Sequence, residues 1–412
     1  MARTLPSQPE VNIGLVGHVD HGKTTLTQAL SGVWTDTHSE ERRRGISIKL
    51  GYADTAFYKT ETGQYYATGR RPEGGKDVDS ELQRVVSFVD APGHETLMAI
   101  MITGASIMDG AMLMVAANET CPQPQTREHL MALEIAGIKN IVIVQNKIDL
   151  VTKERAMESY KEIKDFLEGT IAHNAPVIPV SAHHDVNLDI LIEAIEQTIP
   201  TPDRQEDERA VMHIARSFDV NRPGTRPAKL TGGVIGGSIV EGTFREGDEI
   251  IIGPGRKIEQ GNKTRWEPIE TTITSMQGGG GKRDIMMAGG LCGLGTLLDP
   301  SITTADNLSG QVLAKKGELP TIRTECSISV ELMAAMVSGD GEGADKIYPL
   351  RNNEMLMVNV ATSTSVGVVK GAEKGKATLH LRLPICADEG QRVSLSRRVG
   401  ARWRLIGHGT IQ

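Results

Sequence analysis

The segment at residues 17–24 reads GHVDHGKT and constrains the fold more than any other part of the sequence. It matches the pattern GxxxxGK(S/T) of a phosphate-binding loop, follows an apolar run at 11–17 and precedes helical periodicity that stops at Gly32. A strand, a glycine-rich loop and a helix in this order place backbone N–H groups around a phosphate. The predicted contacts to the nucleotide come from Asp20, His21, Gly22, Lys23, Thr24 and Thr25. Among them, Lys23 would neutralise the β and γ phosphates and the Thr24 hydroxyl would bind Mg²⁺.

Up to about residue 200, short apolar runs alternate with stretches of helical periodicity. The expected strands lie at 11–17, 85–90, 111–118, 140–146 and 175–181, and the expected helices at 23–31, 125–136, 154–167 and 188–199. The apolar stretch 98–117 contains Thr103, Asp109 and two glycines, so we expect the end of a helix followed by a buried strand rather than a membrane span. Such alternation predicts an α/β domain with a mostly parallel sheet covered on both sides.

The character of the sequence changes after Pro200 and Pro202. A charged stretch at 203–209 is typical of a linker, and short β-like runs punctuated by glycine follow it, with little helical periodicity. Two β-barrels of about a hundred residues each would fill the remainder. We place their boundary near 317–320, and we expect the glycines at 278–281 to form a flexible loop tip. The predicted domains are therefore 1–202, 203–318 and 319–412.

The tetrapeptide NKID, which begins at Asn146, ends an expected strand at the rim where ligands bind to parallel sheets. A carboxylate there can accept from both the N1–H and the 2-amino group of guanine, whereas adenine offers neither donor. Asp149 would therefore select guanine, while Asn146 and Lys147 brace the loop and flank the base. The predicted contacts to the base are completed by Ser181, Ala182 and His183. An ordinary strand-to-helix turn could place the same residues there.

The motif DAPGH begins at Asp90 and ends another apolar run. Asp90 can hold Mg²⁺ through water, and the Gly93 N–H can reach the γ-phosphate of a nucleoside triphosphate. His94 lies where a residue that positions the attacking water belongs, so we predict that His94, Gly93 and Lys23 act in catalysis. The alternative is a surface histidine in a turn. The motif RGISI contains Ser47, whose hydroxyl could complete the Mg²⁺ shell.

In this order, the motifs GHVDHGKT, RGISIKLGY, DAPGHE, NKID and SA resemble those of the translational GTPases. The nearest resemblance is to the gamma subunits of archaeal (and eukaryotic) translation initiation factor 2. It extends to RSFDVNRPG from Arg216, GGVIGGS from Gly232, GTLLDP from Gly295 and RWRLIG from Arg402, and it covers nearly the whole chain. The resemblance implies an α/β P-loop GTPase domain followed by two β-barrels, an architecture similar to elongation factor Tu.

The resemblance also implies a function. In its GTP form, a member of this family carries methionylated initiator tRNA to the small ribosomal subunit, as the core of an alpha-beta-gamma heterotrimer, and hydrolyses GTP to GDP as a switch. Carried over by motif, Val19 and Ile46 match hydrophobic residues that flank the path to the catalytic water. Tyr52 matches a tyrosine implicated in holding the aminoacylated end of the tRNA. The expected cofactors are GTP or GDP and Mg²⁺.

Two departures from the family are visible in the sequence. Many relatives carry four zinc-binding cysteines between the first switch and the DxxG motif, but residues 53–89 contain no cysteine, so we expect Mg²⁺ and no zinc. The insertion itself remains as a polar stretch. Ser47 stands where relatives usually have threonine, which keeps the hydroxyl but removes a methyl group and could loosen the ordered switch.

The formal net charge of −7 excludes a uniformly basic coat for nucleic acid but leaves room for a local basic patch. Residues 391–412 contain five arginines and no acidic residue. We call these five the arginine strip: Arg392, Arg397, Arg398, Arg402 and Arg404. Two hypotheses account for it, either contact with tRNA phosphates or a solvated strand face with Trp403 in the barrel core. The four cysteines are far apart and no signal sequence or membrane span is expected, so a cytoplasmic location fits best.

Three alternative functions remain open on the sequence alone. The chain could carry elongator or selenocysteinyl-tRNA, as related elongation factors do. It could be a P-loop kinase that phosphorylates a small molecule, although NKID, DAPGHE and two β-rich domains argue against this. It could also be a scaffold of the heterotrimer with vestigial GTPase activity, against which the intact Lys23, Thr24 and Asp90 argue.

Overall fold

The computed structural model describes residues 4–35, 49–68, 79–94, 97–204, 209–261, 263–333, 335–337, 344–400 and 402–412. By its internal contacts the chain divides into two compact units. One is formed mainly by Leu5–Pro202, and the other by Asp203–Met336 together with Asp345–Gln412. The division falls directly after Pro202, where the character of the sequence changes.

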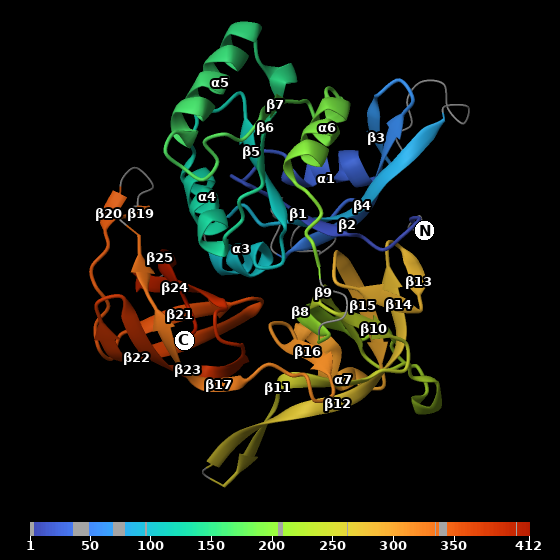
Figure 1. Cartoon of the computed structure of the whole chain (residues 1–412), viewed down its shortest axis with the longest axis vertical. Coiled ribbons are helices and arrows are strands. Elements are labelled where there is room, and N and C mark those ends of the chain that lie inside the picture. Colours follow the sequence, from blue (N-terminus) through green and yellow to red (C-terminus); the bar gives the residue numbers. More distant parts are fainter. Residues whose placement is uncertain are drawn as a thin grey trace. The chain divides into compact units, whose positions relative to one another are not determined.

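The first unit is built on a seven-stranded sheet with the order β3-β2-β4-β1-β5-β6-β7 (Figure 1). Its strands are β1 (Val11–Gly17), β2 (Gly51–Thr60), β3 (Tyr65–Ala67), β4 (Ser80–Asp90), β5 (Gly110–Ala116), β6 (Ile141–Asn146) and β7 (Val177–Pro179). The five strands from β4 to β7 in this order run parallel, whereas β2 and β3 are antiparallel additions beside β4. Every residue of β1, β5 and β6 is buried, as expected for a sheet covered on both faces.

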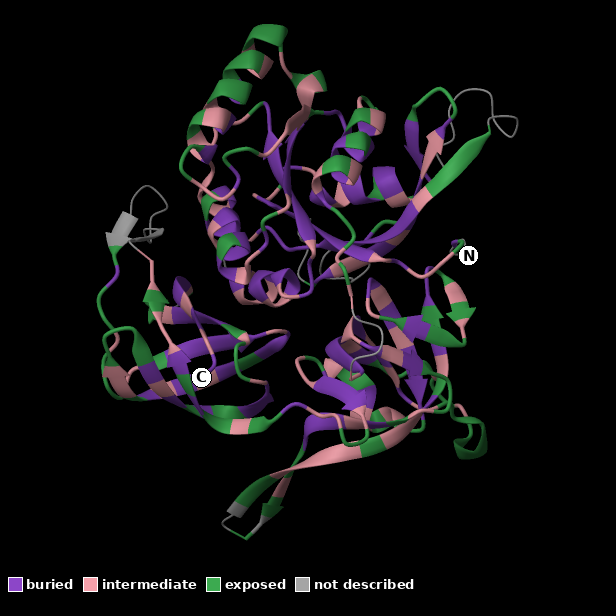
Figure 2. Cartoon of the chain, in the orientation of Figure 1, coloured by how far each residue is buried: buried purple, intermediate pink, exposed green. Residues whose placement is uncertain are grey.

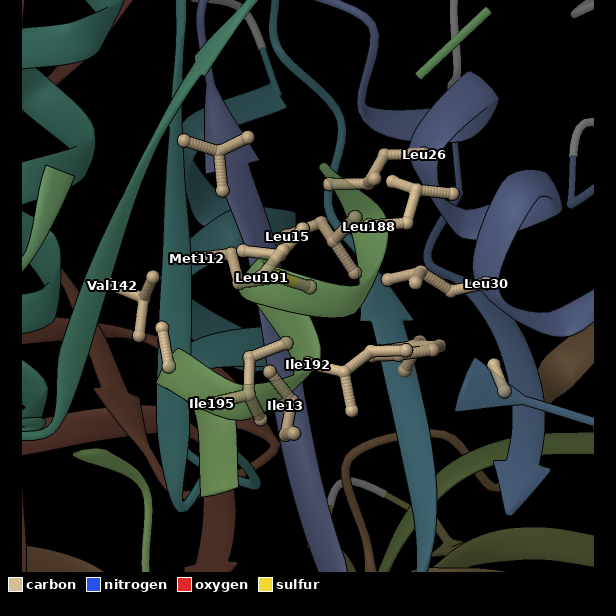
Figure 3. Packing of buried hydrophobic residues seen from close by; sticks show 14 of the residues in the cluster. Ile13, Leu15, Leu26, Leu30, Met112, Val142, Leu188, Leu191, Ile192 and Ile195 are labelled. Carbon is tan, nitrogen blue, oxygen red and sulfur yellow. The ribbon is translucent and has the colours of Figure 1, made fainter. Parts of the chain in front are cut away.

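Helices cover both faces of this sheet. The described helices are α1 (Lys23–Ser31), α3 (Met98–Ala105), α4 (Pro124–Ala136), α5 (Lys153–Leu167) and α6 (Leu188–Thr198), with a short 3-10 turn η3 (Ile148–Leu150). On one face, Leu26 of α1 and Ile195 of α6 belong to one buried cluster with Leu15 of β1 (Figure 3). Burial of each such side chain stabilises the fold by about 1.5–3 kcal/mol relative to exposure. The strand ends are therefore held by a rigid core.

Most predicted elements of this unit are confirmed. Helix α1 ends at Gly32 and α4 ends at Gly137, both with left-handed backbone (φ 76° and 81°), which glycine adopts without strain. The apolar stretch after residue 97 is a helix end followed by a buried strand, as expected. In the described part of the chain, no helix combines the length and apolar character needed to cross a membrane.

One predicted strand differs in extent, and one region for which no strand was predicted forms strands. Strand β7 contains only Val177–Pro179, shorter than the predicted 175–181. Most of β2, all of β3 and the first half of β4 lie in the polar stretch within 53–89, where they form an edge ribbon. Figure 2 shows that the outer part of this ribbon is exposed. Glu81 and Leu82 are among its exposed residues, so the alternation of apolar and polar residues that marks a half-buried strand is weak there.

The first part of the second unit is a closed β-barrel. Its strands are β8 (Val211–Phe218), β9 (Val234–Glu241), β11 (Glu249–Gln260), β12 (Lys263–Gly278), β13 (Gly281–Arg283), β15 (Leu291–Thr296) and β16 (Val312–Lys315), with β10 (Thr243–Arg245) and β14 (Ile285–Met287) as a separate pair and a short helix α7 (Pro300–Thr303). The order β11-β16-β8-β9-β15-β12 closes because β12 also pairs with β11. The glycines at 278–281 form a tight hairpin turn rather than a flexible tip, since Gly278 pairs with Gly281 and both intervening residues have positive φ.

The second part of this unit is another β-barrel. Its strands are β17 (Ile322–Ser329), β18 (Glu331–Leu332), β21 (Met355–Val360), β22 (Ser363–Glu373), β23 (Lys376–Cys386), β24 (Arg392–Val399) and β25 (Arg402–Thr410), and β19 (Ala335–Val337) pairs separately with β20 (Ala344–Lys346). The sheet order is β17-β23-β22-β21-β24-β25-β18, and a bridge between Ile328 and Ile411 joins its ends. The predicted fold class, a mostly parallel α/β domain followed by two β-barrels, is confirmed.

The arginine strip lies on β24 and β25, but its members differ in environment. Arg398 and Arg402 are exposed, whereas the Arg404 side chain is buried. Trp403 is only half-buried and is not part of the core cluster of this barrel, so the expectation that it fills the core is wrong. The arginine strip is therefore not a uniformly exposed strand face above a buried Trp403.

Candidate nucleotide site at the carboxyl edge of the sheet

The predicted nucleotide-binding residues meet at one edge of the parallel sheet. Gly17 ends β1, Asp90 ends β4 and Asn146 ends β6. Since β4, β1, β5 and β6 are parallel neighbours, their carboxyl ends lie side by side. Ligands bind outside the carboxyl ends of strands in sheets of this kind.

The phosphate loop has left-handed backbone at Gly17, Asp20 and Gly22, with φ of 137°, 62° and 92°. These conformations turn the chain sharply between β1 and α1. Gly22 is the N-cap of α1 and no side chain caps the helix, so its first N–H groups point toward the loop. Thr25, in the first turn, is half-buried. The loop thus has the sharp turn and the free helix N-terminus that the sequence pattern predicts.

The ammonium of Lys23 lies inside the curve of this loop. It is buried and donates to the carbonyl oxygens of Gly17 (3.0 Å) and His18 (2.7 Å). Gly93 is adjacent, because a Cβ at that position would lie 2.6 Å from Lys23 Nζ and 2.9 Å from the backbone nitrogen of Val19. The structure therefore brings Lys23, Gly93 and Val19 together, as a γ-phosphate site requires.

Two hydroxyl groups donate to the same oxygen of Asp90. Thr24 Oγ1 lies 2.7 Å from Asp90 Oδ2, and Thr35 Oγ1 lies 2.6 Å from it. Thr24 was predicted as a Mg²⁺ ligand and Thr35 was not, because no motif marks it. The third predicted ligand, Ser47, lies outside the described residues, as does Ile46.

His94 follows Gly93 directly after β4 and is half-buried. Tyr52 lies near the start of β2, where its neighbour Gly51 pairs with Asp90 and Tyr52 itself pairs with Val89. Both residues are therefore at the edge of the sheet that carries the phosphate loop. His94 is adjacent to the glycine that contacts the loop, while Tyr52 is placed one strand further out.

Asn146 ties three loops together. Its Nδ2 donates to the carbonyl of His21 in the phosphate loop (2.9 Å), and its Oδ1 accepts from the N–H of Ala182 (3.1 Å). A Cβ at Gly22 would lie 2.3 Å from Asn146 Nδ2, which shows how closely the loop approaches this side chain. The predicted bracing role of Asn146 thus has a direct geometric basis.

Asp149 follows Asn146 and Lys147, which has left-handed backbone (φ 62°). A hydrogen bond from the Ser181 hydroxyl holds the pKa of Asp149 below its usual range, so the carboxylate is an acceptor at neutral pH. His184 Nε2 lies 3.7 Å from Asp149 Oδ2. The sequence singled out His183, which instead packs edge-on against His184 with ring centroids 4.7 Å apart. Because His183 and His184 are adjacent in the sequence, the pattern alone does not indicate which of them lies near Asp149.

Two buried histidines hold the phosphate loop in place: His21 lies within the loop, and His129 contacts it. His21 Nδ1 is 2.9 Å from the carbonyl of Met114, and its Nε2 is 3.4 Å from Glu119. His129, in the middle of α4, accepts through Nδ1 from the N–H of Gly17 (2.7 Å). Burial lowers the pKa of His21 to about 4 and that of His129 to about 3, so both imidazoles are neutral at pH 7. His21 was predicted to contact phosphate because it lies in the loop motif, whereas no motif marks His129.

The donor set fits a nucleoside triphosphate with Mg²⁺. Backbone N–H groups, a buried ammonium and glycines without room for a side chain form the phosphate cradle. Hydroxyl and carboxylate oxygens, which Mg²⁺ prefers, are supplied by Thr24 and Asp90. Among the residues that the structure describes, no group of three or more histidine, cysteine or acidic side chains is arranged to hold a metal.

Comparisons with known protein families agree with this arrangement. The family described as Elongation factor Tu GTP binding domain matches residues 8–201. Elongation factor Tu domain 2 matches 232–314, and Initiation factor eIF2 gamma, C terminal, matches 324–411.

Individual relatives extend over nearly the full chain. The translation initiation factor 2 subunit gamma of Methanothermobacter thermautotrophicus is 56% identical over 99% of this chain and 100% of its own. The protein of the same name from Methanocaldococcus jannaschii is 56% identical, covering 98% of both chains. The one from Natronomonas pharaonis is 54% identical over 98% of both.

Solved structures share the fold at low sequence identity. A bacterial selenocysteine-specific elongation factor EF-Sec has a TM-score of 0.75 at 22% identity, and this chain spans 58% of its length. The elongation factor SelB of Methanococcus maripaludis, solved with the GTP analogue GppNHp, has a TM-score of 0.72 at 22% identity, with 80% of its length covered.

Proposed function

Because the chain belongs to the family of translation initiation factor 2 gamma subunits, we propose that its GTP form carries methionylated initiator tRNA to the small ribosomal subunit. The chain is a translational GTPase of the initiation-factor class, which hydrolyses GTP to GDP and phosphate. In the proposal, hydrolysis is the switch that separates the tRNA-bound state from the released state.

The observation that carries the proposal is the position of Asp149 at the same sheet edge as Lys23 and Asp90. An ionised carboxylate held by Ser181 accepts from the two donors of guanine. The lysine and the aspartate serve the other end of the same ligand, the triphosphate. A base selector and a γ-phosphate sensor on one edge are what a guanine-nucleotide switch needs.

The proposed hydrolytic roles follow from these contacts. Water attacks the γ-phosphorus, the bond to the bridging oxygen breaks, and GDP leaves with that electron pair. Lys23 neutralises the phosphates, the Gly93 N–H binds the γ-phosphate and His94 orients the water. Val19, whose backbone lies against Gly93, flanks the path of that water. Gly93 lies against the loop that holds Lys23. Loss of the γ-phosphate would therefore allow the backbone at Gly93 and His94 to move.

Thr24, Asp90 and Ser47 are the residues that we propose to hold Mg²⁺, which neutralises charge on the β and γ phosphates when bound. No zinc is proposed for the cysteine-free region 53–89.

The proposed domains are a nucleotide-binding domain at 1–202 and β-barrels at 203–318 and 319–412. Tyr52 is proposed to contact the aminoacylated tRNA end, and alpha and beta subunits of the factor are the proposed partners in the cytoplasm.

The test is binding of fluorescent Met-tRNA to the full chain, with initiator and elongator species compared in the presence of a non-hydrolysable GTP analogue or GDP. We expect the initiator tRNA to bind at least about tenfold more tightly with the analogue than with GDP, a coupling of about 1.4 kcal/mol. Equal binding of initiator and elongator Met-tRNA would support an elongation-type carrier instead. Transfer of phosphate to a small molecule would support the kinase alternative.

A further inference from the structure

His129 lies in the middle of α4 and is fully buried, yet it contacts the nucleotide loop directly. Its Nδ1 lies 2.7 Å from the backbone nitrogen of Gly17. Because a backbone N–H can only donate, Nδ1 must be the unprotonated nitrogen of a neutral imidazole. The bond joins residues 112 positions apart and fixes α4 to the first residue of the phosphate loop.

The backbone at Gly17 is constrained by its positive φ and by close contact with Met114. Its φ of 137° is accessible to glycine, and a Cβ there would lie 2.5 Å from the carbonyl oxygen of Met114 on β5. The N–H of Gly17 is therefore buried at the point where the chain leaves the sheet, and a buried N–H needs an acceptor. His129 supplies that acceptor.

The same residue connects His129 to the phosphate-binding lysine. The carbonyl of Gly17 accepts from Lys23 Nζ at 3.0 Å, while its N–H donates to His129. The other imidazole nitrogen, Nε2, has no hydrogen-bond partner within the described part of the chain. The single polar contact of this buried side chain is thus the one to the loop, and a leucine of similar size would otherwise fill the site at lower desolvation cost.

We propose that His129 is a positioning residue for the nucleotide: by accepting from Gly17, it holds the phosphate loop in the conformation that binds the β and γ phosphates. The proposal rests on the proposed GTPase site and adds a determinant of its affinity. A purely structural histidine would affect stability without affecting nucleotide affinity. Any side chain that places a hydrogen-bond acceptor at the Nδ1 position should therefore preserve nucleotide affinity.

Three substitutions separate these roles. His129→Asn keeps an acceptor, since the amide Oδ1 can occupy the place of Nδ1. His129→Gln carries its acceptor one bond further out, and His129→Leu removes it. A matched control is His213→Leu on β8, because His213 is also a buried neutral imidazole but lies in the other unit. Affinities and dissociation rates for fluorescent GDP and a GTP analogue are measured on the full chain, with thermal unfolding in parallel.

We expect His129→Gln and His129→Leu to bind both nucleotides about tenfold more weakly, mainly through faster dissociation, while His129→Asn stays within about threefold of the wild type. His213→Leu should change thermal stability and leave nucleotide affinity unchanged. Wild-type affinity in folded His129→Gln, or equal weakening in the Asn and Gln variants, would overturn the inference. A wild-type chain that binds no guanine nucleotide would instead overturn the proposed function itself.

Discussion

The hydroxyl of Thr35 donates to Oδ2 of Asp90 over 2.6 Å, at the oxygen that also accepts from Thr24. Thr35 is buried and precedes the segment that contains Ser47, so it links the start of the first switch to the proposed Mg²⁺ carboxylate. A Cβ at Gly51 would lie 2.5 Å from Thr35 Cβ, which leaves this side chain little room to move.

Replacement of Thr35 by valine keeps its shape and removes the hydrogen bond. We expect Thr35→Val to require a higher Mg²⁺ concentration for GTP binding, by about threefold to tenfold, because one neutral-to-charged hydrogen bond that orients Asp90 is lost. Thr35→Ser, which keeps the hydroxyl, is the control. Titration of GTP-analogue affinity against Mg²⁺ measures the effect, and identical titrations for the valine and serine variants would contradict it.

Gly22 and Gly32 bracket α1 and both have positive φ, but only one faces the site. A Cβ at Gly22 would lie 2.3 Å from Asn146 Nδ2, whereas a Cβ at Gly32 meets nothing within 4 Å. We expect Gly22→Ala to reduce nucleotide affinity more than about tenfold and Gly32→Ala to lower stability by about 1 kcal/mol without affecting affinity. Calorimetric binding of GDP, with denaturant unfolding, compares the two. Equal affinities in both variants would show that the contact with Asn146 is unimportant.

Buried histidines predict a loss of stability in mild acid. Burial lowers the pKa of His213 from 6.5 to about 4, so the folded protein keeps it neutral while the unfolded chain takes up a proton below pH 6.5. The stability contribution is complete above pH 6.5 and declines as the pH falls toward 4. Lowering the pH from 7 to 5.5 should reduce the free energy of unfolding of both proteins. We expect this reduction to be about 1 kcal/mol smaller in His213→Leu than in the wild type. Denaturant titrations at the two pH values measure this difference, and equal losses would contradict the assignment.

Of the arginine strip, Arg398 is better suited than Arg397 to test contact with tRNA phosphates. The Arg397 guanidinium donates to Glu354 (Nε to Oε1, 2.5 Å) and to the Tyr348 carbonyl (3.0 Å). Its charge is therefore paired within the barrel. Arg398 is exposed. If the strip contacts tRNA phosphates, Arg398→Glu should weaken initiator-tRNA binding and reduce the slope of log affinity against log salt by about one. Arg382→Glu, the same charge change at an exposed residue of β23, is the control. An unchanged slope for Arg398→Glu would show that Arg398 does not contact tRNA phosphates.

The sequence was most informative where function depends on local order. A strand, a glycine-rich loop and a helix start occupy consecutive residues, so the environment of Lys23 could be predicted from its neighbours alone. Asp90 and Asn146 could be placed at the same edge, because parallel strands bring their carboxyl ends together.

Long-range contacts were not predictable in this way. His129 reads as one residue of an amphipathic helix, and only the packing of α4 brings it to Gly17. Thr35 lies in no motif, and its bond to Asp90 depends on how the chain passes the edge of β4. The strands β2 and β3 were missed although most of their residues are buried or half-buried, because their buried residues do not alternate regularly with exposed polar ones.

In the proposed function, a guanine nucleotide at this site controls binding of initiator tRNA. Xanthine carries a carbonyl where guanine carries the 2-amino group, so an asparagine amide in place of the Asp149 carboxylate should favour xanthine. Such a change keeps the hydrogen bond with Ser181 available. We expect it to transfer control of the switch from a guanine to a xanthine nucleotide.

The measurement is the affinity of the full chain for initiator Met-tRNA, for wild type and Asp149→Asn, with non-hydrolysable analogues of GTP and of xanthosine triphosphate. We expect the wild type to bind tRNA with the GTP analogue only, and Asp149→Asn to bind it about tenfold more tightly with the xanthosine analogue than with the GTP analogue. Two results would contradict the proposed guanine-dependent control of tRNA binding. In the first, folded Asp149→Asn still responds to the GTP analogue as the wild type does; in the second, it responds to neither nucleotide.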